Sequence, residues 1–211
     1  MMTYPLNAEL RETIAQNLSR HDRIAVADES LRPAAVAFVL GAASIDAPAD
    51  IAVTLRTSKL NRHSGQYALP GGRLDEGEGA IDAALRETCE EIGLPLARSS
   101  VLGLLDDLVT RSGFVITPVV AWAGAEPKFH PDPGEVAQIF RIPLSELDLP
   151  SIPEMVADKS GGRSVMSAVF PTIGHRMYAP TAALLYQFRE VCLRGRTTRV
   201  GDLGQPEFTR N

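Results

Sequence analysis

Apolar residues recur at helical spacing in two long segments of the chain. Over residues 6–20 they stand four positions apart, and over residues 79–92 they follow the period of 3.6 residues, so both segments are predicted to be helices. The packing face expected for residues 79–92 consists of Ile81, Leu85, Thr88 and Ile92. Gly93 and Pro95 follow, and they favour a helix that ends at residue 92. A third helix is predicted over residues 181–193.

Shorter apolar runs predict strands over residues 34–40, 51–55, 67–69, 101–105, 114–122, 136–142 and 165–170. The fourth and fifth runs are expected to form a hairpin that turns near Ser112 and Gly113. Residues 129–134 are expected to be a loop, and residues 144–149 a short helical turn. Strands and helices mix without a regular βαβ rhythm, which favours a mixed α/β or α+β sheet sandwiched by helices.

Composition narrows the class of protein. The chain has 211 residues, of which 45% are hydrophobic and 22% charged, and this is ordinary globular composition. A net charge of −5 argues against a general nucleic-acid binder and suggests carboxylates held by metal ions. No apolar run approaches the roughly 20 residues of a membrane span, and no secretory signal is visible, so a cytoplasmic protein is expected. Cys89 is expected to pack inside the protein, and the sequence leaves open whether it forms a disulfide with Cys192.

The acidic residues of the helix at 79–92 form an unusual group. Glu87, Glu90 and Glu91 stand at positions i, i+3 and i+4, so they share one helix face and repel one another. They also lie near the helix C-terminus, where the helix dipole disfavours negative charge. Mg²⁺ or Mn²⁺ would resolve this conflict because these cations prefer hard oxygen ligands. The competing interpretation is an acidic face that is simply solvated.

The segment around these glutamates resembles the Nudix box, Gly-x5-Glu-x7-Arg-Glu-U-x-Glu-Glu-x-Gly-U, in which U is a bulky aliphatic residue. The fixed positions are matched by Gly72, Glu78, Arg86, Glu87, Glu90, Glu91 and Gly93. Leu94 matches the last U, whereas Thr88 stands at the other. This resemblance implies the Nudix fold, an α/β/α sandwich of the α+β class, and hydrolysis of a diphosphate linked to another group.

The resemblance also implies roles for individual residues. Glu87 and Glu91 would be the principal metal ligands, with Glu90 and the backbone of Gly72 close to the same cations. Glu78 would orient the loop or a further metal, and Arg86 would pair with a carboxylate and hold its rotamer. Nudix enzymes often recruit a carboxylate from the region of Glu135. The sequence leaves open which of Glu87, Glu90 and Glu135 is the general base.

Residues 56–72 resemble the additional motif of the coenzyme A pyrophosphatase branch. The matching residues are Arg56, Leu60, His63, Gly65, Pro70, Gly71 and Gly72, and the departures are Thr57, Asn61 and Leu69. Residues 131–144 and 175–185 resemble the same branch. The resemblance implies cleavage of coenzyme A or acyl-coenzyme A to 3′,5′-ADP and (acyl-)4′-phosphopantetheine.

Four cationic side chains precede the catalytic loop, namely Arg56, Lys59, Arg62 and His63. Such a cluster suits the 3′-phosphate of coenzyme A. Together with Gly71, these residues are the predicted substrate-binding set. A solvated basic loop is the alternative.

The expected organisation is an N-terminal helical arm over residues 1–33, a Nudix domain over residues 34–194 and a polar tail over residues 195–211. The tail is expected to be disordered. The expected partner is a small nucleotide-diphosphate substrate, without nucleic acid or membrane, and a homodimer stays open. Two other functions compete: a Nudix hydrolase of ADP-ribose, dinucleotides or nucleoside triphosphates, and a non-catalytic ligand-sensing module.

Overall fold

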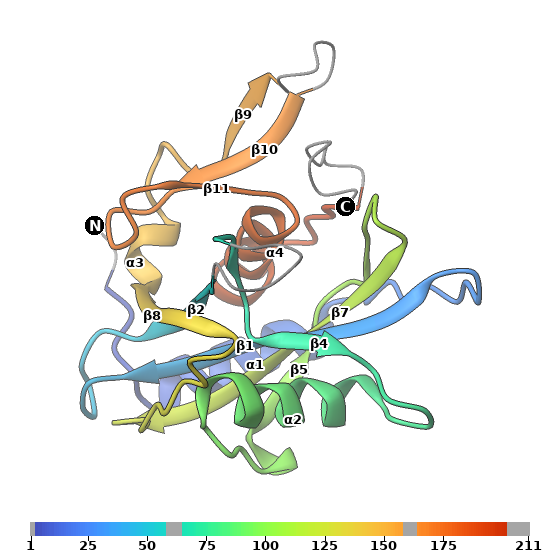
Figure 1. The fold of residues 1–211 in the computed structure, drawn as a ribbon. Helices are drawn as coiled ribbons and strands as arrows, with labels where there is room; N and C mark the ends of the chain where they lie inside the picture. The colour runs from blue at the N-terminus through green and yellow to red at the C-terminus, as the bar shows by residue number, and fades with distance from the viewer. Residues whose placement is uncertain (1–2, 58–64, 158–163, 202–211) are drawn as a thin grey trace.

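A mixed β-sheet forms the centre of the protein (Figure 1). The computed structural model describes residues 3–57, 65–157 and 164–201. Strand β1 (Arg32–Ala42) pairs in parallel with β7 (Phe114–Ala125) and antiparallel with β2 (Asp50–Arg56). The other strands extend this centre: β3 (Tyr67–Ala68) and β8 (Val136–Pro143) on β2, β4 (Gly71–Arg73) on β1, and β5 (Val101–Leu104) and β6 (Leu108–Val109) on β7.

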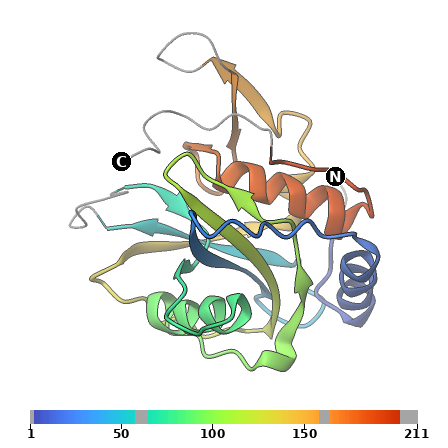
Figure 2. The same cartoon turned by 90° about the vertical axis from the view of Figure 1, so that its right-hand side faces the viewer.

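Helices cover both faces of the sheet, which gives the α/β/α sandwich predicted from the sequence (Figures 1 and 2). Helix α2 (Ala80–Ile92) lies on one face. Helix α1 (Ala8–Arg20) and helix α4 (Thr181–Phe188), which continues into a π-helical segment (Arg189–Leu193), lie on the other. No helix in the described part of the chain is long and apolar enough to cross a membrane.

Side-chain size along β1 decides how closely each helix approaches the sheet. Toward α2 the strand presents Ala35 and Ala37, which pack in one core with Ala83 and Ala84 of the helix. Toward α4 it presents larger side chains, and the ring of Phe38 stacks on that of Phe188 with centroids 4.9 Å apart. Because small residues meet on the α2 side, that helix can approach the face of the sheet closely.

A second, three-stranded antiparallel sheet stands apart from the first (Figure 1). It follows the short helix α3 (Leu144–Leu147) and contains β9 (Glu154–Ala157), β10 (Ser164–Val169) and β11 (Arg176–Tyr178). The hydrophobic pattern predicted only β10. The neighbouring strands β9 and β11 have only four and three residues, so they are too short to carry a periodic signal.

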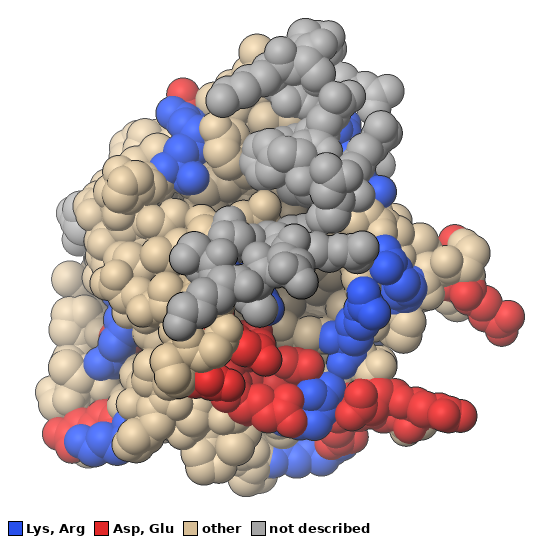
Figure 3. All heavy atoms as spheres, viewed as in Figure 1, with Lys and Arg blue, Asp and Glu red and all other residues tan. Residues whose placement is uncertain are grey.

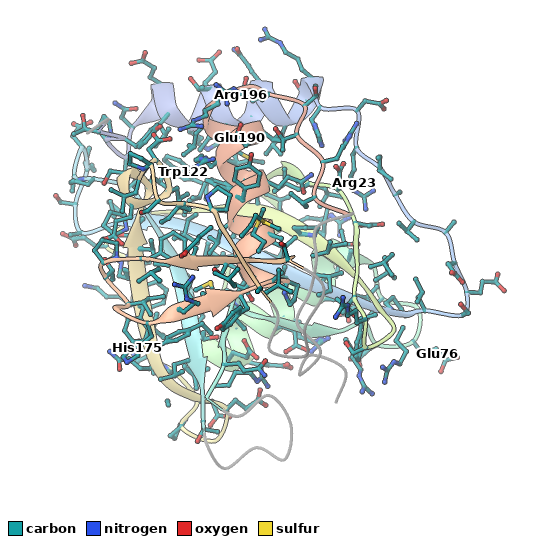
Figure 4. The ribbon with its side chains drawn as sticks, turned by 90° about the horizontal axis from the view of Figure 1, so that it is seen from above. Arg23, Glu76, Trp122, His175, Glu190 and Arg196 are labelled. Atoms are coloured by element: carbon teal, nitrogen blue, oxygen red, sulfur yellow. The ribbon has the colours of Figure 1, made fainter. Side chains whose placement is uncertain are left out.

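Both ends of the described chain pack onto the domain. In α1, Leu10, Ile14 and Leu18 enter the same core as α4. Near the other end, Val200 is 1% exposed and Arg196 reaches Glu190 at 2.9 Å, a pair labelled in Figure 4. The expectation of a disordered tail from residue 195 onward is therefore wrong for residues 195–201. The division into arm, domain and tail stays a prediction.

Candidate active site

Helix α2 ends where the sequence predicts, and its end fixes a neighbouring loop. Gly93 adopts φ +64°, and its N–H donates to the carbonyl of Cys89 at 3.0 Å. A Cβ on Gly93 would lie 2.3 Å from the carbonyl oxygen of His130, so only glycine permits this approach. The N–H groups of His130 and Asp132 in turn donate to the carbonyls of Ile92 and Glu91 at 2.8 and 3.0 Å.

The buried face of α2 differs from the predicted one. Ile81 and Leu85 are only half-buried, and Cys89 is exposed rather than packed. Glu91 is buried instead, together with Ala83, Ala84, Thr88 and Ile92. The physical reason is the alanine-lined surface of β1, which accepts the small residues of the helix and turns Glu91 toward the strand ends. Both cysteines are free thiols, so no disulfide joins them.

Glu91 is the most buried of the candidate ligands, with its side chain 1% exposed. Its Oε1 accepts from Nη1 of Arg56 at 2.8 Å, and its Oε2 accepts from the N–H of Gly71 at 3.2 Å. Burial raises the pKa of Glu91 to about 7, although Arg56 and the Gly71 N–H act in the opposite direction. A buried carboxylate of this kind gains from any cation that can reach it.

Glu87 lies one helical turn earlier and rests against the backbone of Gly72. A Cβ on Gly72 would lie 2.2 Å from Oε1 of Glu87, so the missing side chain makes the space that the carboxylate fills. Burial raises the pKa of Glu87, the arginine Arg86 opposes this shift, and the charges of Glu90 and Glu135 add to it. The carboxylates of Glu87, Glu90 and Glu135 are therefore close enough to interact electrostatically.

Arg86 holds the acidic side of α2 together. Its guanidinium donates to Oε1 and Oε2 of Glu78 at 3.0 Å each, and to Glu87 and Glu90 at 2.9 Å each. It also donates to the carbonyl of Arg73 at 3.0 Å. The bonds from Arg86 and from the Asp75 N–H lower the pKa of Glu78. In Figure 3 red side chains gather in a patch near the middle of this face, with blue side chains of Lys or Arg beside it.

Glu135 reaches the site from the loop before β8. Its side chain is 45% exposed, and its Oε2 lies 3.8 Å from Nη2 of Arg56. The backbone is anchored as well, because the Thr57 N–H donates to the Glu135 carbonyl at 2.9 Å. The structure therefore brings together Glu87, Glu90, Glu91, Glu135, Arg86, Gly71, Gly72 and Arg56. Lys59, Arg62 and His63 of the predicted substrate set lie outside the described residues.

The donor chemistry of this site fits a hard divalent cation. It offers carboxylate oxygens on adjacent helical turns beside glycine backbone, which are the ligands that Mg²⁺ and Mn²⁺ prefer. The carboxylates are turned toward the two arginines, and no three acidic, His or Cys side chains within residues 3–57, 65–157 and 164–201 form a ready metal cluster. Cation binding would therefore require exchange of arginine contacts.

Sequence reasoning missed two features of the site. The pair between Arg56 and Glu91 joins residues 35 positions apart, and no local pattern predicts such a contact. Strand β4 was also missed, because two of its three residues are glycines. The motif Pro70-Gly71-Gly72 was the available signal for a close approach of backbone at this point.

The comparisons agree with the fold and the box. The model of the NUDIX domain matches residues 31–160, so the chain belongs to the NUDIX domain family. Among curated relatives, an uncharacterized Nudix hydrolase NudL from Pectobacterium atrosepticum is 44% identical over 95 residues, which are 44% of this chain and 50% of that protein. The NudL from Citrobacter koseri is 40% identical over the same shares of both proteins. The chain thus spans about half the length of the curated relatives it matches.

Among solved structures, a MutT/nudix family protein from Enterococcus faecalis superposes with a TM-score of 0.53. The superposition covers 89% of this chain and 75% of that protein, at 15% sequence identity. At this identity the likeness concerns the fold.

Proposed function

We propose that this chain is a metal-dependent diphosphatase that cleaves the pyrophosphate bond of a nucleotide-diphosphate derivative, with coenzyme A or acyl-coenzyme A as the substrate. The observation that carries the proposal is the group of Glu87, Glu90, Glu91 and Glu135 beside the backbone of Gly71 and Gly72. Such a group of like charges is unfavourable for the helix alone; divalent cations would balance it and could in turn hold a diphosphate.

Each residue has a proposed part in the reaction. Glu87 and Glu91 would hold Mg²⁺ or Mn²⁺, with Glu90 and the Gly72 carbonyl at the edge of the same site. Such cations supply charge neutralisation on the diphosphate and a more acidic water. Arg86 keeps Glu87 and Glu90 in place through its hydrogen bonds of 2.9 Å. Glu87, Glu90 and Glu135 are the candidates to accept the proton of the attacking water.

Coenzyme A is favoured over other diphosphates by the motif at residues 56–72. Coenzyme A carries a 3′-phosphate in addition to its diphosphate, and the basic residues Lys59, Arg62 and His63 stand in that motif. An arginine forms bidentate hydrogen bonds to phosphate, so Arg62 is the proposed main contact. The products would be 3′,5′-ADP and (acyl-)4′-phosphopantetheine.

One observation favours a second candidate, a substrate without the 3′-phosphate. Arg56 was predicted to belong to the phosphate-binding cluster, but its guanidinium contacts Glu91 and Glu135. With Asn61 in place of a basic residue, the cluster has fewer cations for a remote phosphate. ADP-ribose and dinucleotides would fit a cluster reduced in this way.

The test compares initial rates with coenzyme A, 3′-dephospho-coenzyme A, ADP-ribose, NADH and dGTP at saturating Mg²⁺ or Mn²⁺. We expect kcat/KM for coenzyme A to exceed that for its dephospho form by about 10- to 150-fold, as charge-assisted hydrogen bonds to one remote phosphate would give. Arg62→Ala should remove most of that ratio and leave turnover of the dephospho form nearly unchanged. Equal kcat/KM for the two forms would instead support the second candidate.

A further inference from the structure

Two guanidinium groups divide the carboxylates of the site between them. Arg86 contacts Glu78, which lies just before α2, and Glu87 and Glu90, which lie on α2. Arg56 contacts Glu91 and Glu135. Only Arg56 comes from a different layer of the fold, because it ends strand β2. This arrangement makes Arg56 the main charged partner of the most buried ligand.

The contact between Arg56 and Glu91 differs in burial at its two ends. The Glu91 side chain is 1% exposed, whereas the Arg56 side chain is 23% exposed. A guanidinium that is partly in water can leave this pair without being stranded in an apolar interior, but the carboxylate cannot. If the contact breaks, Arg56 is therefore the partner that moves.

The backbone of Arg56 restricts this movement to the side chain. Its N–H donates to the carbonyl of Gln66 at 3.0 Å, and its carbonyl accepts from the N–H of Gly65 at 3.2 Å. The next residue, Thr57, donates to the Glu135 carbonyl. The guanidinium also lies 3.8 Å from the Glu135 carboxylate, which offers a second position within the site.

A divalent cation and the Arg56 guanidinium compete for the same carboxylate. Glu91 Oε2 is already engaged by the Gly71 N–H, so Oε1, the oxygen that Arg56 holds at 2.8 Å, is the one to exchange. We propose that Arg56 is an exchangeable counter-cation of Glu91, which it holds in orientation until a divalent cation displaces the guanidinium toward Glu135 and the incoming diphosphate. Arg56 is thus a positioning residue whose contact the cation must break.

This proposal rests on the metal dependence proposed above but not on the identity of the substrate. An exchangeable Arg56 and a fixed supporting residue would have opposite effects on cation affinity. Removing the competing charge should tighten cation binding, whereas removing a fixed support should weaken it. A conservative change that keeps the charge should preserve the wild-type affinity.

The experiment measures Mn²⁺ binding to the full-length protein without substrate, from the loss of the electron paramagnetic resonance signal of free Mn²⁺ at pH 8.5. We expect Arg56→Gln to bind Mn²⁺ about tenfold more tightly than the wild type, equivalent to about 1.4 kcal/mol. Arg56→Lys should stay close to the wild type. The matched control is Arg98→Gln. It removes an exposed arginine that pairs with Asp82, a residue of the same helix α2 that carries Glu91.

A second measurement covers the case in which Arg56→Gln is unstable. In chelator its melting temperature should fall below that of the wild type, and saturating Mn²⁺ should reduce this difference in melting temperature. A variant that folds only when Mn²⁺ is present would also support the proposal. Unchanged or weaker Mn²⁺ binding in Arg56→Gln, or a gap that persists at saturating Mn²⁺, would overturn the proposal. If the wild type binds no Mn²⁺, the metal-dependent function itself fails.

Discussion

Gly72 and Glu87 are complementary in shape: a Cβ added to the glycine would lie 2.2 Å from Oε1 of the glutamate. The atom in conflict is the end of a flexible side chain, so Gly72→Ala should fold while pushing the Glu87 carboxylate from its position. We expect kcat/KM to fall on the order of 100-fold, as misplacement of a reacting group by about 1 Å can cause. Melting curves in chelator should change little.

The control for this prediction is Gly79→Ala. The nearest atom to a Cβ at Gly79 is Oδ2 of Asp82 at 3.5 Å, an ordinary contact distance. Activity close to wild type is expected there. If both variants lose activity equally, the loss would reflect the loop in general and not the space beneath Glu87.

Glu91→Gln should abolish turnover without loss of stability in chelator. The amide keeps the shape of the side chain but removes a charge that is buried and close to Glu87. We expect activity to fall by at least about 100-fold, because a lost metal ligand removes several kcal/mol of transition-state stabilisation. Steady-state rates with Mg²⁺ and Mn²⁺ measure this, and near-wild-type rates at saturating Mg²⁺ would exclude Glu91 as a ligand.

The pH dependence of stability should also identify Glu91. In the folded protein its pKa is raised to about 7, above the value of about 4.3 expected in the unfolded chain. The folded state then binds more protons between these values, so stability in chelator should fall as the pH rises from about 4 to about 7. Glu91→Gln lacks this loss. Over the same pH range, its free energy of unfolding should therefore rise relative to that of the wild type by on the order of 2 kcal/mol.

Urea denaturation of both proteins across that pH window measures the effect. The difference between them is the informative quantity, because the other ionisable groups contribute equally to both. A difference that is constant with pH would mean that Glu91 titrates normally.

Divalent cations should stabilise the protein against heat, and chelator should stop hydrolysis. A cation that binds only the folded state at 100 times its Kd adds about 2.7 kcal/mol to the free energy of unfolding. Thermal melts with increasing Mg²⁺ or Mn²⁺ test the first part, and rates after exhaustive chelation test the second. Activity that survives chelation would rule out the proposed chemistry.

Asp106 provides a prediction remote from the site. Burial would raise the pKa of Asp106, but hydrogen bonds from the Ile24 N–H, Arg199, His21 and Gln187 outweigh it and lower that pKa. Because the pKa is lowered in the folded state, the ionised carboxylate stabilises the protein above pH of about 4, and this stabilisation is lost as the pH falls further.

Asp106→Asn should therefore cost about 1–3 kcal/mol at pH 7, because the buried donors of His21 and Gln187 lose a charged acceptor. The cost should shrink in acid. Urea titrations at pH 7 and at about pH 3.5 compare the two conditions. Activity per folded molecule should not change, since Asp106 contacts none of the candidate ligands.

The sequence allowed the local structure of the site to be predicted but not its contacts across the fold. Helix α2, its end at Gly93 and the acidic residues follow from periodicity and capping, which act over a few residues. The burial of Glu91 depends on the alanines of β1, which lie about fifty positions earlier in the chain. The pairing of Arg56 depends on where β2 ends beside that helix. Both are properties of packing between layers.

The roles of single residues stay predictions in the same way. Arg86 contacts Glu78, Glu87 and Glu90, but its role in the reaction stays a prediction, and Lys59, Arg62 and His63 lie outside the described residues. A homodimer and a cytoplasmic location likewise stay predictions.

The backbone bonds between the end of α2 and the loop at residues 129–134 have a consequence for how Glu91 and Glu135 are held relative to each other. His130 and Asp132 are tied to the last carbonyls of the helix, and the Asp132 carboxylate accepts from the N–H of Gly134, so the loop before Glu135 is built outward from the end of α2. The side chain of Asp132 is therefore part of this link, whereas His130 contributes its backbone N–H. A change in loop length after Asp132 would shift Glu135 and break its backbone bond with Thr57, while the helical ligands keep their positions.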